Sequence, residues 1–581
     1  MLRVYEGDVI EGEVVDFASD GEGIVKIDSY AVFVPFAIKG ETIRARVRHA
    51  KKDYAFADLI EVLSVSKDRI KPKCTYFGRC GGCDLQHLSR DCQLYIKKQS
   101  VQNAIKKIAN IDIAVDDAVR LNDWEYRNKI SLPFGYKSKS GRVTLGFFEK
   151  RSHSVVPMKW CPLHGQWAST LMADVSDWAN ANSISVYDEI SRKGLLRHLV
   201  ARMLDTLTVT LVVNGSRVPH LDALCQKLEE DFPSVAVYIS ENTKNTNAIF
   251  GDEARLVYGK ERKQNLGTFE AVVSPLSFLQ VNNDVRDAIY DDVCHVLEDF
   301  DGDIVELYSG VGLLTAQIAT RLKDSKITAV EIVPDATRNA DALMKSLSLD
   351  ERVTNVCADA LDFMRKMSEE ADKNASQSDE KLPEEITSSP YYLGEEKRIS
   401  KPSALILDPP RKGCDKDVLE GAKKANFAKI VYVSCNPQTL ARDLKILSDR
   451  YIVERVTPYD MFPQTSNTET LVQLSHKIPD SHIVVKVDFD KDNSIQTDTL
   501  LKNAQAYKPA ERVTYKMIQA YVEEKYGFKV HTAYIADVKR SYGLPMYDAS
   551  NAVEELKRPR QHPSEKMVEA IKDALKHFGI I

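Results

Sequence analysis

The sequence predicts an α/β fold, in which a Rossmann-like domain follows a small N-terminal β-barrel and a mixed α/β central domain. Three observations carry this prediction. Short alternating strands with glycine turns fill residues 1–62, strands and helices are mixed in residues 63–275, and helices alternate with apolar strands in residues 276–478. Closely spaced short strands favour a barrel, whereas strands that alternate with helices are typical of a parallel sheet.

Length and composition limit the class of protein. A chain of 581 residues is too long for one ordinary domain, and 43% hydrophobic with 28% charged residues is typical of a soluble globular protein. No apolar run approaches the roughly 20 residues that span a bilayer. The first residues alternate like a strand and lack the pattern of a signal peptide. We therefore expect a cytoplasmic protein that does not contact membranes.

The net charge of -6 does not by itself indicate a nucleic-acid-binding protein. A whole-chain sum can hide a basic face, however. The later strands of the predicted barrel carry five basic residues, namely Arg44, Arg46, Arg48, Lys51 and Lys52. Such a stripe fits a phosphate backbone and a solvated outer face equally well.

A cluster of cysteines follows the predicted barrel. Cys74, Cys80 and Cys83 fall within ten residues, and two glycines between the last two let both sulfurs face one centre. Three thiolates at this spacing indicate zinc or an iron–sulfur cluster rather than free thiols. A fourth ligand must come from elsewhere, and Cys161, between Trp and Pro, is a better candidate than Cys92. The spacing does not decide between the two kinds of metal site.

Residues 303–315 have the pattern of a cofactor-binding turn. An apolar strand runs into Tyr308-Ser-Gly-Val-Gly312 and then into a helix, so a ligand can approach the backbone there. The next strand ends in Glu331, which is placed to accept both ribose hydroxyls, and a third element ends in Asp359, which is placed to meet an adenine edge. No Gly-Lys-Ser/Thr follows, so a nucleoside without phosphates, such as S-adenosylmethionine, fits best. An ordinary strand and turn is the alternative interpretation.

Two further strands end in polar residues at the edge where ligands are expected. One is followed by Asp408-Pro-Pro-Arg-Lys-Gly413, and the next by Cys435-Asn-Pro. Because the carboxyl ends of parallel strands meet at one edge, we expect Asp408 and Cys435 to lie beside the cofactor turn. Cys435 is therefore a candidate nucleophile, although a half-buried structural thiol is the simpler interpretation of it alone. Glu469 is the candidate base, and taken alone it fits a surface carboxylate.

Two parts of the chain fall outside this pattern. Residues 368–402 are charged, Ser-rich and poor in apolar residues, which predicts a flexible surface insertion. Residues 479–510 have the character of a linker. Residues 511–581 predict a small helical module of unknown role, with helices near 513–522 and 532–540. A helix-turn-helix-like binder and a docking module both fit this tail.

Together these motifs resemble those of the bacterial RNA (uracil-5-)-methyltransferases, which act on 23S ribosomal RNA or on the T-loop of tRNA. The resemblance runs from residue 1 to about 476 and is closest to the ribosomal branch, which has a TRAM barrel and a cysteine cluster. It rests on the four cysteines, Phe278-Leu-Gln280-Val-Asn282, Tyr308-Ser-Gly-Val-Gly312, Asp408-Pro-Pro-Arg-Lys-Gly413, Ser434-Cys435-Asn436-Pro437 and Glu469. The family often has histidines where this chain has Gln464 and Asn467.

The resemblance implies S-adenosylmethionine-dependent methylation of uridine at carbon 5 in 23S ribosomal RNA. Cys435 would add to carbon 6, and Glu469 would remove the carbon 5 proton after methyl transfer so that the thiol is eliminated. Four residues would contact the cofactor, namely Gln280, Tyr308, Glu331 and Asp408. Four cysteines would hold a [4Fe–4S] cluster, namely Cys74, Cys80, Cys83 and Cys161. The barrel and the central domain would grip RNA, and we expect a monomer without an obligate protein partner.

Three alternatives remain. A tRNA T-loop methyltransferase shares the chemistry, but the cysteine cluster and the barrel argue against that branch. A non-catalytic iron–sulfur RNA-binding protein is disfavoured because the nucleophile, the base and the cofactor turn are all present. Cytosine-5 RNA methyltransferases resemble a pattern with a second cysteine after a proline, where this chain has Asp408-Pro409-Pro410.

Overall fold

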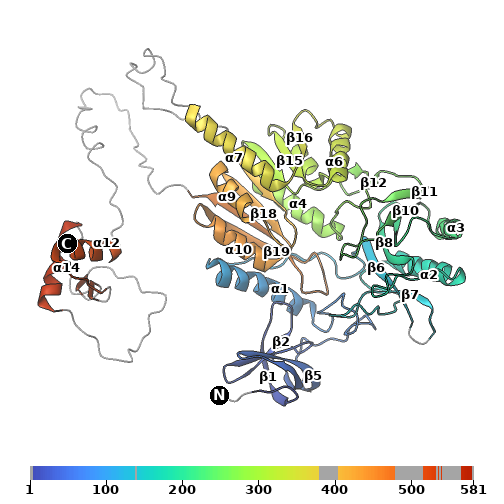
Figure 1. The fold of residues 1–581 in the computed structure, drawn as a ribbon, viewed down its shortest axis with the longest axis horizontal. Helices are drawn as coiled ribbons and strands as arrows, with labels where there is room; N and C mark the ends of the chain where they lie inside the picture. Colours follow the sequence, from blue (N-terminus) through green and yellow to red (C-terminus); the bar gives the residue numbers. More distant parts are fainter. Residues whose placement is uncertain are drawn as a thin grey trace, which may run out of the picture. The chain divides into compact units, whose positions relative to one another are not determined.

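The fold is that of a computed structural model, which describes residues 4–137, 140–377, 403–477, 515–531, 534–535, 538–539 and 564–578. The chain divides into two compact units, Met1–Asp480 and Ser481–Ile581 (Figure 1). Within the described ranges, every helix is too short or too polar to cross a bilayer.

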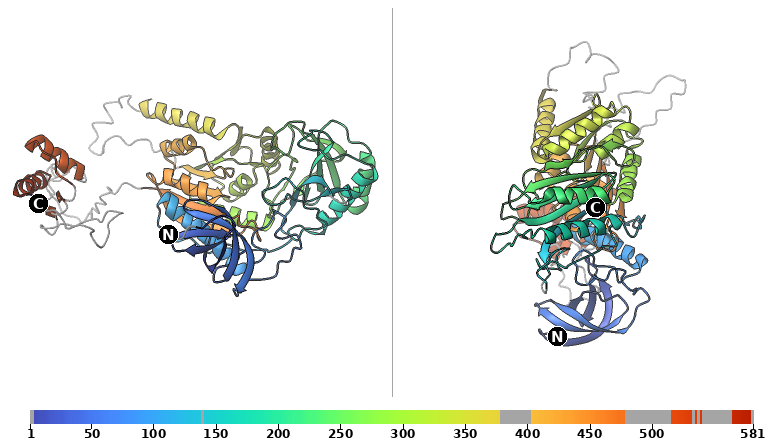
Figure 2. Two further views of the ribbon diagram at one scale, coloured as in Figure 1. Left: turned by 60° about the horizontal axis from the view of Figure 1, so that its bottom comes forward. Right: turned by 90° about the vertical axis from the view of Figure 1, so that its right-hand side faces the viewer.

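The first five strands close into a barrel, drawn in dark blue in Figure 2. Its strand order is β1-β2-β3-β5-β4, with bounds β1 Val9–Phe17, β2 Gly23–Ile27, β3 Tyr30–Val34, β4 Thr42–Ala50 and β5 Tyr54–Ser64. Alternate residues of each strand point inward, so small apolar side chains such as Val14, Val32 and Ala45 fill the interior.

The basic stripe of the barrel is partly neutralised by the barrel's own acids. Arg44 pairs with Glu11 and Glu61, and Arg48 pairs with Asp58, all at exposed positions. These two arginines therefore fit the solvated outer face better than a free phosphate-binding stripe.

The cysteine segment and helix α1 (Arg90–Ala104), which continues into the π-helical turn η1 (Ile105–Ala109), follow the barrel. A six-stranded sheet of order β11-β10-β9-β8-β6-β7 comes next. Its bounds are β6 Lys129–Tyr136, β7 Val143–Leu145, β8 Leu196–Met203, β9 Leu207–Val213, β10 Val235–Glu241 and β11 Arg255–Gly259. One face packs on α2 (Gln166–Ala181) and α3 (Leu221–Asp231). A short hairpin, β12 (Gln264–Asn265) and β13 (Glu270–Ala271), precedes the last sheet.

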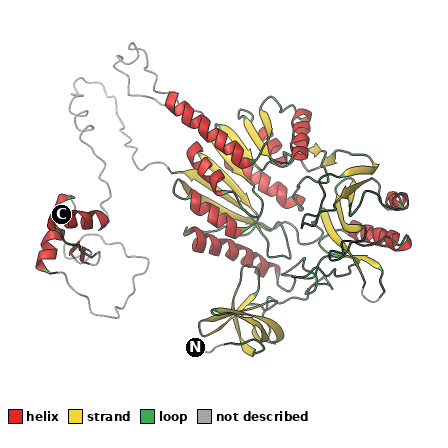
Figure 3. Ribbon diagram, viewed as in Figure 1, coloured by secondary structure: helices red, strands yellow, loops and turns green. Residues whose placement is uncertain are grey.

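A seven-stranded sheet of order β16-β15-β14-β17-β18-β20-β19 forms the second half of this unit. Its bounds are β14 Asp303–Leu307, β15 Ile327–Glu331, β16 Val353–Cys357, β17 Ser403–Leu407, β18 Lys429–Ser434, β19 Tyr451–Tyr459 and β20 Glu469–His476. The first five strands in this order are parallel, and β20 runs antiparallel to both of its neighbours. Figure 3 distinguishes these strands from the flanking helices.

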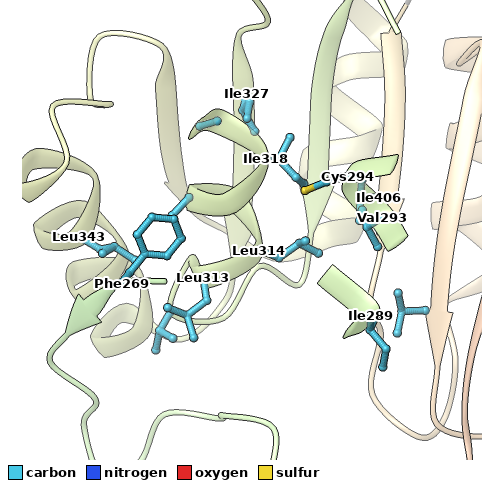
Figure 4. Close-up of a cluster of buried hydrophobic side chains, with 14 of the residues drawn as sticks. Phe269, Ile289, Val293, Cys294, Leu313, Leu314, Ile318, Ile327, Leu343 and Ile406 are labelled. Carbon is cyan, nitrogen blue, oxygen red and sulfur yellow. The ribbon is translucent and has the colours of Figure 1, made fainter. Parts of the chain in front are cut away.

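Strand alternation divides the core of this half into two layers. Ile304, Ile406 and Val431 point to one face and pack with α4 (Asn283–Leu297), α5 (Leu313–Arg321) and α6 (Pro334–Ser346). Figure 4 labels part of this cluster, including Ile406. Val305 and Leu405 point to the other face, toward η1, α7 (Ala360–Gln377), α9 (Lys416–Ala425) and α10 (Pro437–Leu447). Each buried aliphatic side chain contributes roughly 1.5–3 kcal/mol. The barrel followed by mixed and doubly wound α/β parts confirms the predicted fold class.

The segments outside the α/β pattern are only partly described. Helix α7 extends to Gln377 and so includes the first ten residues of the expected insertion at 368–402, and residues 378–402 lie outside the described part of the chain. The expected linker at 479–510 lies outside the described residues. In the tail, α12 (Tyr515–Tyr526) and α14 (Glu565–His577) share a small apolar core with Ile535 and Val538.

Candidate active site

The turn after β14 has the backbone conformation that its glycines favour. Tyr308, Gly310 and Gly312 have φ values of 68°, 57° and 78°. A Cβ atom on Gly312 would lie 2.9 Å from Cβ of Ala340 in α6, whereas one on Gly310 would meet no atom within 4 Å. Close helix packing therefore requires Gly312, and Gly310 borders open space. The helix after the turn begins at Leu313, as predicted, so its first N–H groups lie at this edge of the sheet.

The two acids predicted from the neighbouring strands lie at the same edge. Glu331, at the end of β15, accepts the N–H of Gly310 at 2.9 Å and the N–H of Val333 at 2.8 Å. Its carboxylate therefore holds the glycine turn against β15 and still has free lone pairs. Asp359 follows β16, is exposed, and accepts the N–H of Leu361 at 2.8 Å, which caps α7.

Asp408 follows β17, the strand on the other side of β14. It is half-buried and accepts no hydrogen bond from any residue that the structure describes. Burial raises the pKa of Asp408 to about 7. Burial also raises the pKa of Glu306, inside β14, to about 8, and the charges of Asp408 and Glu331 contribute to this increase. Crowded carboxyl groups of this kind favour a cationic ligand, because a positive charge relieves their mutual repulsion.

Tyr308 and Gln280 complete the predicted cofactor set. The side chain of Tyr308 lies against Cys414, and burial raises the pKa of its hydroxyl, which stays a donor at neutral pH. Gln280 is buried just before α4, and its carbonyl oxygen accepts the side-chain N–H of Asn128 at 3.0 Å. Both residues therefore have fixed positions, Tyr308 in the turn itself and Gln280 on the segment that leads into α4.

Cys435 and Glu469 are brought together by the pairing of β18 with β20. Ser434 pairs with Thr470 in this antiparallel ladder, so the next step of the register places Cys435 opposite Glu469. Cys435 is half-buried and Glu469 is buried. Asn436 caps α10 by accepting the N–H of Gln438 at 3.0 Å, and its amide also donates to the carbonyl of Arg411. These bonds hold the cysteine turn beside the loop that follows Asp408.

Burial and the neighbouring carboxylates favour the uncharged forms of both groups in this pair, and Arg411 opposes that effect. Burial, and next the charge of Glu469, raise the pKa of the Cys435 thiol to about 11, while Arg411 lowers it. Burial and then Asp408 raise the pKa of Glu469 well above its usual value. Oε2 of Glu469 is buried without a hydrogen-bond partner among the described residues. A buried unpaired oxygen is costly, so this carboxyl group favours a ligand that supplies a proton or a donor.

The loop before Glu469 is anchored by helix α1. Lys97 donates to the carbonyl oxygens of Phe462 at 3.0 Å and Asn467 at 2.7 Å, and it forms a fully buried ion pair with Asp460. Arg90 forms a second ion pair with Asp460. The position of the glutamate therefore depends on a helix that lies more than 300 residues earlier in the chain.

The cysteine segment holds the same loop from another side. The carbonyl oxygen of Gln464 accepts the N–H groups of Asp84 at 3.2 Å and Leu85 at 3.0 Å, and its side chain bonds to Gln93. Gln464 has a φ of 71°, so its backbone is strained and these contacts hold it. Gln464, which stands where the family often has a histidine, therefore uses its side-chain amide to hold the loop in place.

We expect Lys97→Met to lower the free energy of unfolding by about 3 kcal/mol, because it leaves a buried carboxylate with one partner fewer. Chemical denaturation followed by circular dichroism measures the loss. Lys98→Met is the matched control, since Lys98 pairs with the exposed Asp117 and should cost less than about 1 kcal/mol. Equal losses in the two variants would contradict the anchoring role of Lys97.

The four cysteines of the predicted cluster line one cavity of about 60 Å³, together with Arg127 and Phe147. Cys92 lies instead in α1, in an apolar group with Leu88 and Ile96. Cys161 is thus the cysteine that meets Cys74, Cys80 and Cys83. Among the described residues, no three His, Cys, Asp or Glu side chains are spaced to hold a single metal ion. The four thiols thus line a common cavity.

Several residues that shape the site were not predicted. Lys97, Asp460 and Gln93 have no signal in the sequence, because their importance arises from contacts between distant segments. Glu306 had a weak signal, an acid inside an apolar strand. Its oxygen accepts the hydroxyl of Thr315 at 2.7 Å in the buried layer under the turn.

Comparisons with known proteins agree with this geometry. Residues 267–477 match the tRNA (uracil-5-)-methyltransferase family, and residues 3–60 match the TRAM domain. An RNA methyltransferase of Staphylococcus epidermidis is 32% identical over 485 residues, which cover 82% of this chain and 99% of the relative. An RNA methyltransferase of Clostridium tetani is 34% identical over 472 residues, which cover 80% of this chain and 95% of the relative.

A solved structure supports the fold. The Pyrococcus abyssi tRNA (uracil-54, C5)-methyltransferase, crystallised with S-adenosyl-L-homocysteine, superposes with a TM-score of 0.60. The match covers 80% of this chain and 99% of that protein at 24% sequence identity. The sequence matches show that the chain belongs to the tRNA (uracil-5-)-methyltransferase family of RNA methyltransferases, with a TRAM domain at its N-terminus.

Proposed function

We propose that this enzyme methylates carbon 5 of a uridine in 23S ribosomal RNA, with Cys435 as the nucleophile and Glu469 as the base. The observation that carries the proposal is a carboxyl oxygen of Glu469 that has no hydrogen-bond partner among the described residues and is buried opposite Cys435 in the register of β18 and β20. A thiol and a carboxyl group so placed meet the two requirements of methylation at an unactivated ring carbon.

The chemistry begins at carbon 6 of the uracil. Cys435 first loses its thiol proton to solvent, its thiolate sulfur bonds to carbon 6, and the electrons of the 5,6 double bond move to make carbon 5 nucleophilic. S-adenosylmethionine, when bound, supplies an electrophilic methyl group to carbon 5. Glu469 then takes the proton from carbon 5, the double bond re-forms, and the carbon–sulfur bond breaks to release the Cys435 thiolate. Arg411 lowers the pKa of both groups and so favours their charged forms.

The residues at the edge of the sheet fit this cofactor. Glu331 has lone pairs for ribose hydroxyls, Asp359 is exposed at the neighbouring strand end, and Gly310 borders open space for the nucleoside. Asp408 offers a carboxyl group without a partner among the described residues, which suits an ammonium or sulfonium group. Gln280 and Tyr308 are the remaining proposed contacts.

We further propose that Cys74, Cys80, Cys83 and Cys161 hold a [4Fe–4S] cluster. Four thiols around one cavity are a donor set that iron–sulfur clusters use. The cluster would stabilise the segment whose N–H groups hold Gln464.

Anaerobically purified protein should be brown and lose its colour in Cys161→Ser, because one of four thiolate ligands is then missing. Metal analysis by mass spectrometry and the visible spectrum measure this, and Cys92→Ser is the matched control that should keep the colour. Colourless, zinc-loaded wild-type protein would contradict the iron–sulfur assignment and favour zinc.

The choice of 23S ribosomal RNA is supported by the cysteine cavity together with the TRAM barrel. The fold of the Pyrococcus abyssi enzyme, which acts on uracil 54 of tRNA, supports a second candidate, tRNA. Methyl transfer from labelled cofactor to unmodified 23S ribosomal RNA and to unmodified tRNA, followed by nucleoside mass analysis, separates them. We expect 5-methyluridine in the ribosomal RNA only. Methylation of tRNA alone would keep the chemistry and change the substrate.

A further inference from the structure

A second cavity lies away from Cys435, between the TRAM barrel and the cysteine segment. It has a volume of about 440 Å³ and is lined chiefly by Phe36 from the barrel and by Arg69, Lys71, Phe77 and His87 from the segment that follows. Neither the nucleophile nor any of the proposed cofactor contacts borders it. The methylation chemistry therefore leaves this cavity unexplained.

Three flat rings form the wall of the cavity. Phe36 lies edge-on to Phe77 and to His87, with distances between ring centroids of 5.4 Å and 5.6 Å. The ring centroids of Phe77 and His87 are 5.6 Å apart, and their ring planes make an angle of 31°. His87 is buried, and burial lowers its pKa to about 3, so its ring is uncharged at neutral pH. His87 therefore backs the two phenylalanines, which are only partly buried, and exposed aromatic faces are the surface on which nucleic-acid bases stack.

The backbone of Phe36 is held in an unfavourable conformation. Its φ is 66°, in a region that bulky residues avoid. Arg69 stabilises it by donating to the carbonyl oxygen of Phe36 at 2.7 Å, while the same guanidinium pairs with the buried Glu41 at 2.6 Å. Strain of this kind persists where the surroundings enforce it, and it is common at binding sites.

The charge around the cavity is positive. Arg69 is neutralised by Glu41, but Lys71 and its neighbours Lys67, Lys73 and Arg79 are exposed and have no acidic partner among the described residues. Lys73 lies over the ring of Trp124 at 4.9 Å. Aromatic faces beside cations without acidic partners match a base attached to a phosphate backbone better than they match a protein surface.

We propose that this cavity binds an unpaired base of the RNA substrate, stacked against Phe36 and Phe77, with the adjoining phosphate at Lys71. The proposal rests on the proposed methylation of RNA. It does not depend on which uridine is methylated or on whether the substrate is ribosomal RNA or tRNA. Phe77 also borders the cysteine cavity, so the bound base would lie next to the segment that anchors the loop of Glu469. The site would hold a second nucleotide while the target uridine reaches Cys435.

Binding of a single-stranded oligouridylate of about twelve nucleotides tests the proposal without any methylation. We expect Phe36→Leu to weaken the affinity about tenfold, because an aliphatic side chain keeps the volume and loses the stacking face. Phe36→Tyr should bind like the wild type. Phe56→Leu, in the same barrel but outside the cavity, is the matched control. Lys71→Gln should weaken the salt dependence of oligonucleotide affinity by the equivalent of about one released counterion.

Photocrosslinking locates the bound base. An oligonucleotide that contains 4-thiouridine should crosslink to peptides with Phe36 or Phe77 in the holoenzyme, and this product should disappear in Phe36→Leu. Wild-type affinity of Phe36→Leu, or crosslinks confined to peptides elsewhere, would overturn the proposal. Because Cys435→Ala should bind and crosslink like the wild type, a failure of the proposed methylation chemistry would leave this result interpretable.

Discussion

Replacing Cys435 with alanine should reduce the rate of methyl transfer by roughly 10⁴-fold or more. Losses of this size are typical when an enzyme's covalent nucleophile is removed. Carbon 5 of uracil cannot displace a sulfonium methyl group until a thiolate has added to carbon 6. The cofactor turn lies on β14 and α5, so the affinity for S-adenosylmethionine should stay unchanged. Steady-state transfer of labelled methyl groups and titration calorimetry measure the two quantities.

The control for this prediction is another thiol. Cys225 lies in α3 of the central sheet and touches none of the proposed site residues, so Cys225→Ala should retain the rate. An active Cys435→Ala enzyme would remove the covalent mechanism. Loss of cofactor affinity in the same variant would indicate instead that Cys435 supports the fold of the site.

Replacing Glu469 with glutamine should trap the enzyme on its RNA. An amide cannot accept the carbon 5 proton, so addition and methyl transfer proceed but elimination stalls, and turnover falls roughly 10²–10⁴-fold. The size and shape of the side chain are nearly retained, so the buried position is preserved. A denaturing gel of the variant with RNA and cofactor should show a slowly migrating covalent adduct.

Two controls make the adduct specific. Glu454→Gln, at an exposed position on β19, should turn over like the wild type and show no adduct. The double variant Cys435→Ala/Glu469→Gln should also show none, because no sulfur is available to bond to carbon 6. If Glu469→Gln alone gives no adduct but still loses turnover, the carboxyl group acts before methyl transfer and its proposed role fails.

The sequence predicted the parts of the site that depend on local pattern. The glycine turn, Glu331, Asp408 and Cys435 each follow an apolar strand, and parallel strands bring such positions to one edge. The pairing of Cys435 with Glu469 was harder to predict from the sequence, because it requires β20 to insert antiparallel between β18 and β19. Two stretches of apolar alternation do not specify that register.

Other features could not be predicted because they depend on contacts between distant segments. Lys97 is a charged residue on an otherwise ordinary helix, and only its burial against Asp460 gives it a role. The aromatic cavity likewise combines Phe36 from the barrel with Phe77 and His87 from the next segment. The sequence left the role of the basic stripe open, because it could not show that Arg44 and Arg48 of β4 pair with acids on neighbouring strands.

The anchoring of the glutamate loop by α1 has a consequence for the order of folding. Arg90 and Asp460 are separated by 370 residues, so their ion pair closes one of the longest loops in the chain. Contacts of such high sequence separation form late, and during synthesis the N-terminal partner must wait for the other to leave the ribosome. A nascent chain therefore carries its barrel, its cysteine segment and its cofactor turn before it can assemble the thiol and the carboxyl group. Catalytic competence therefore requires that the chain as far as Glu469 has left the ribosome.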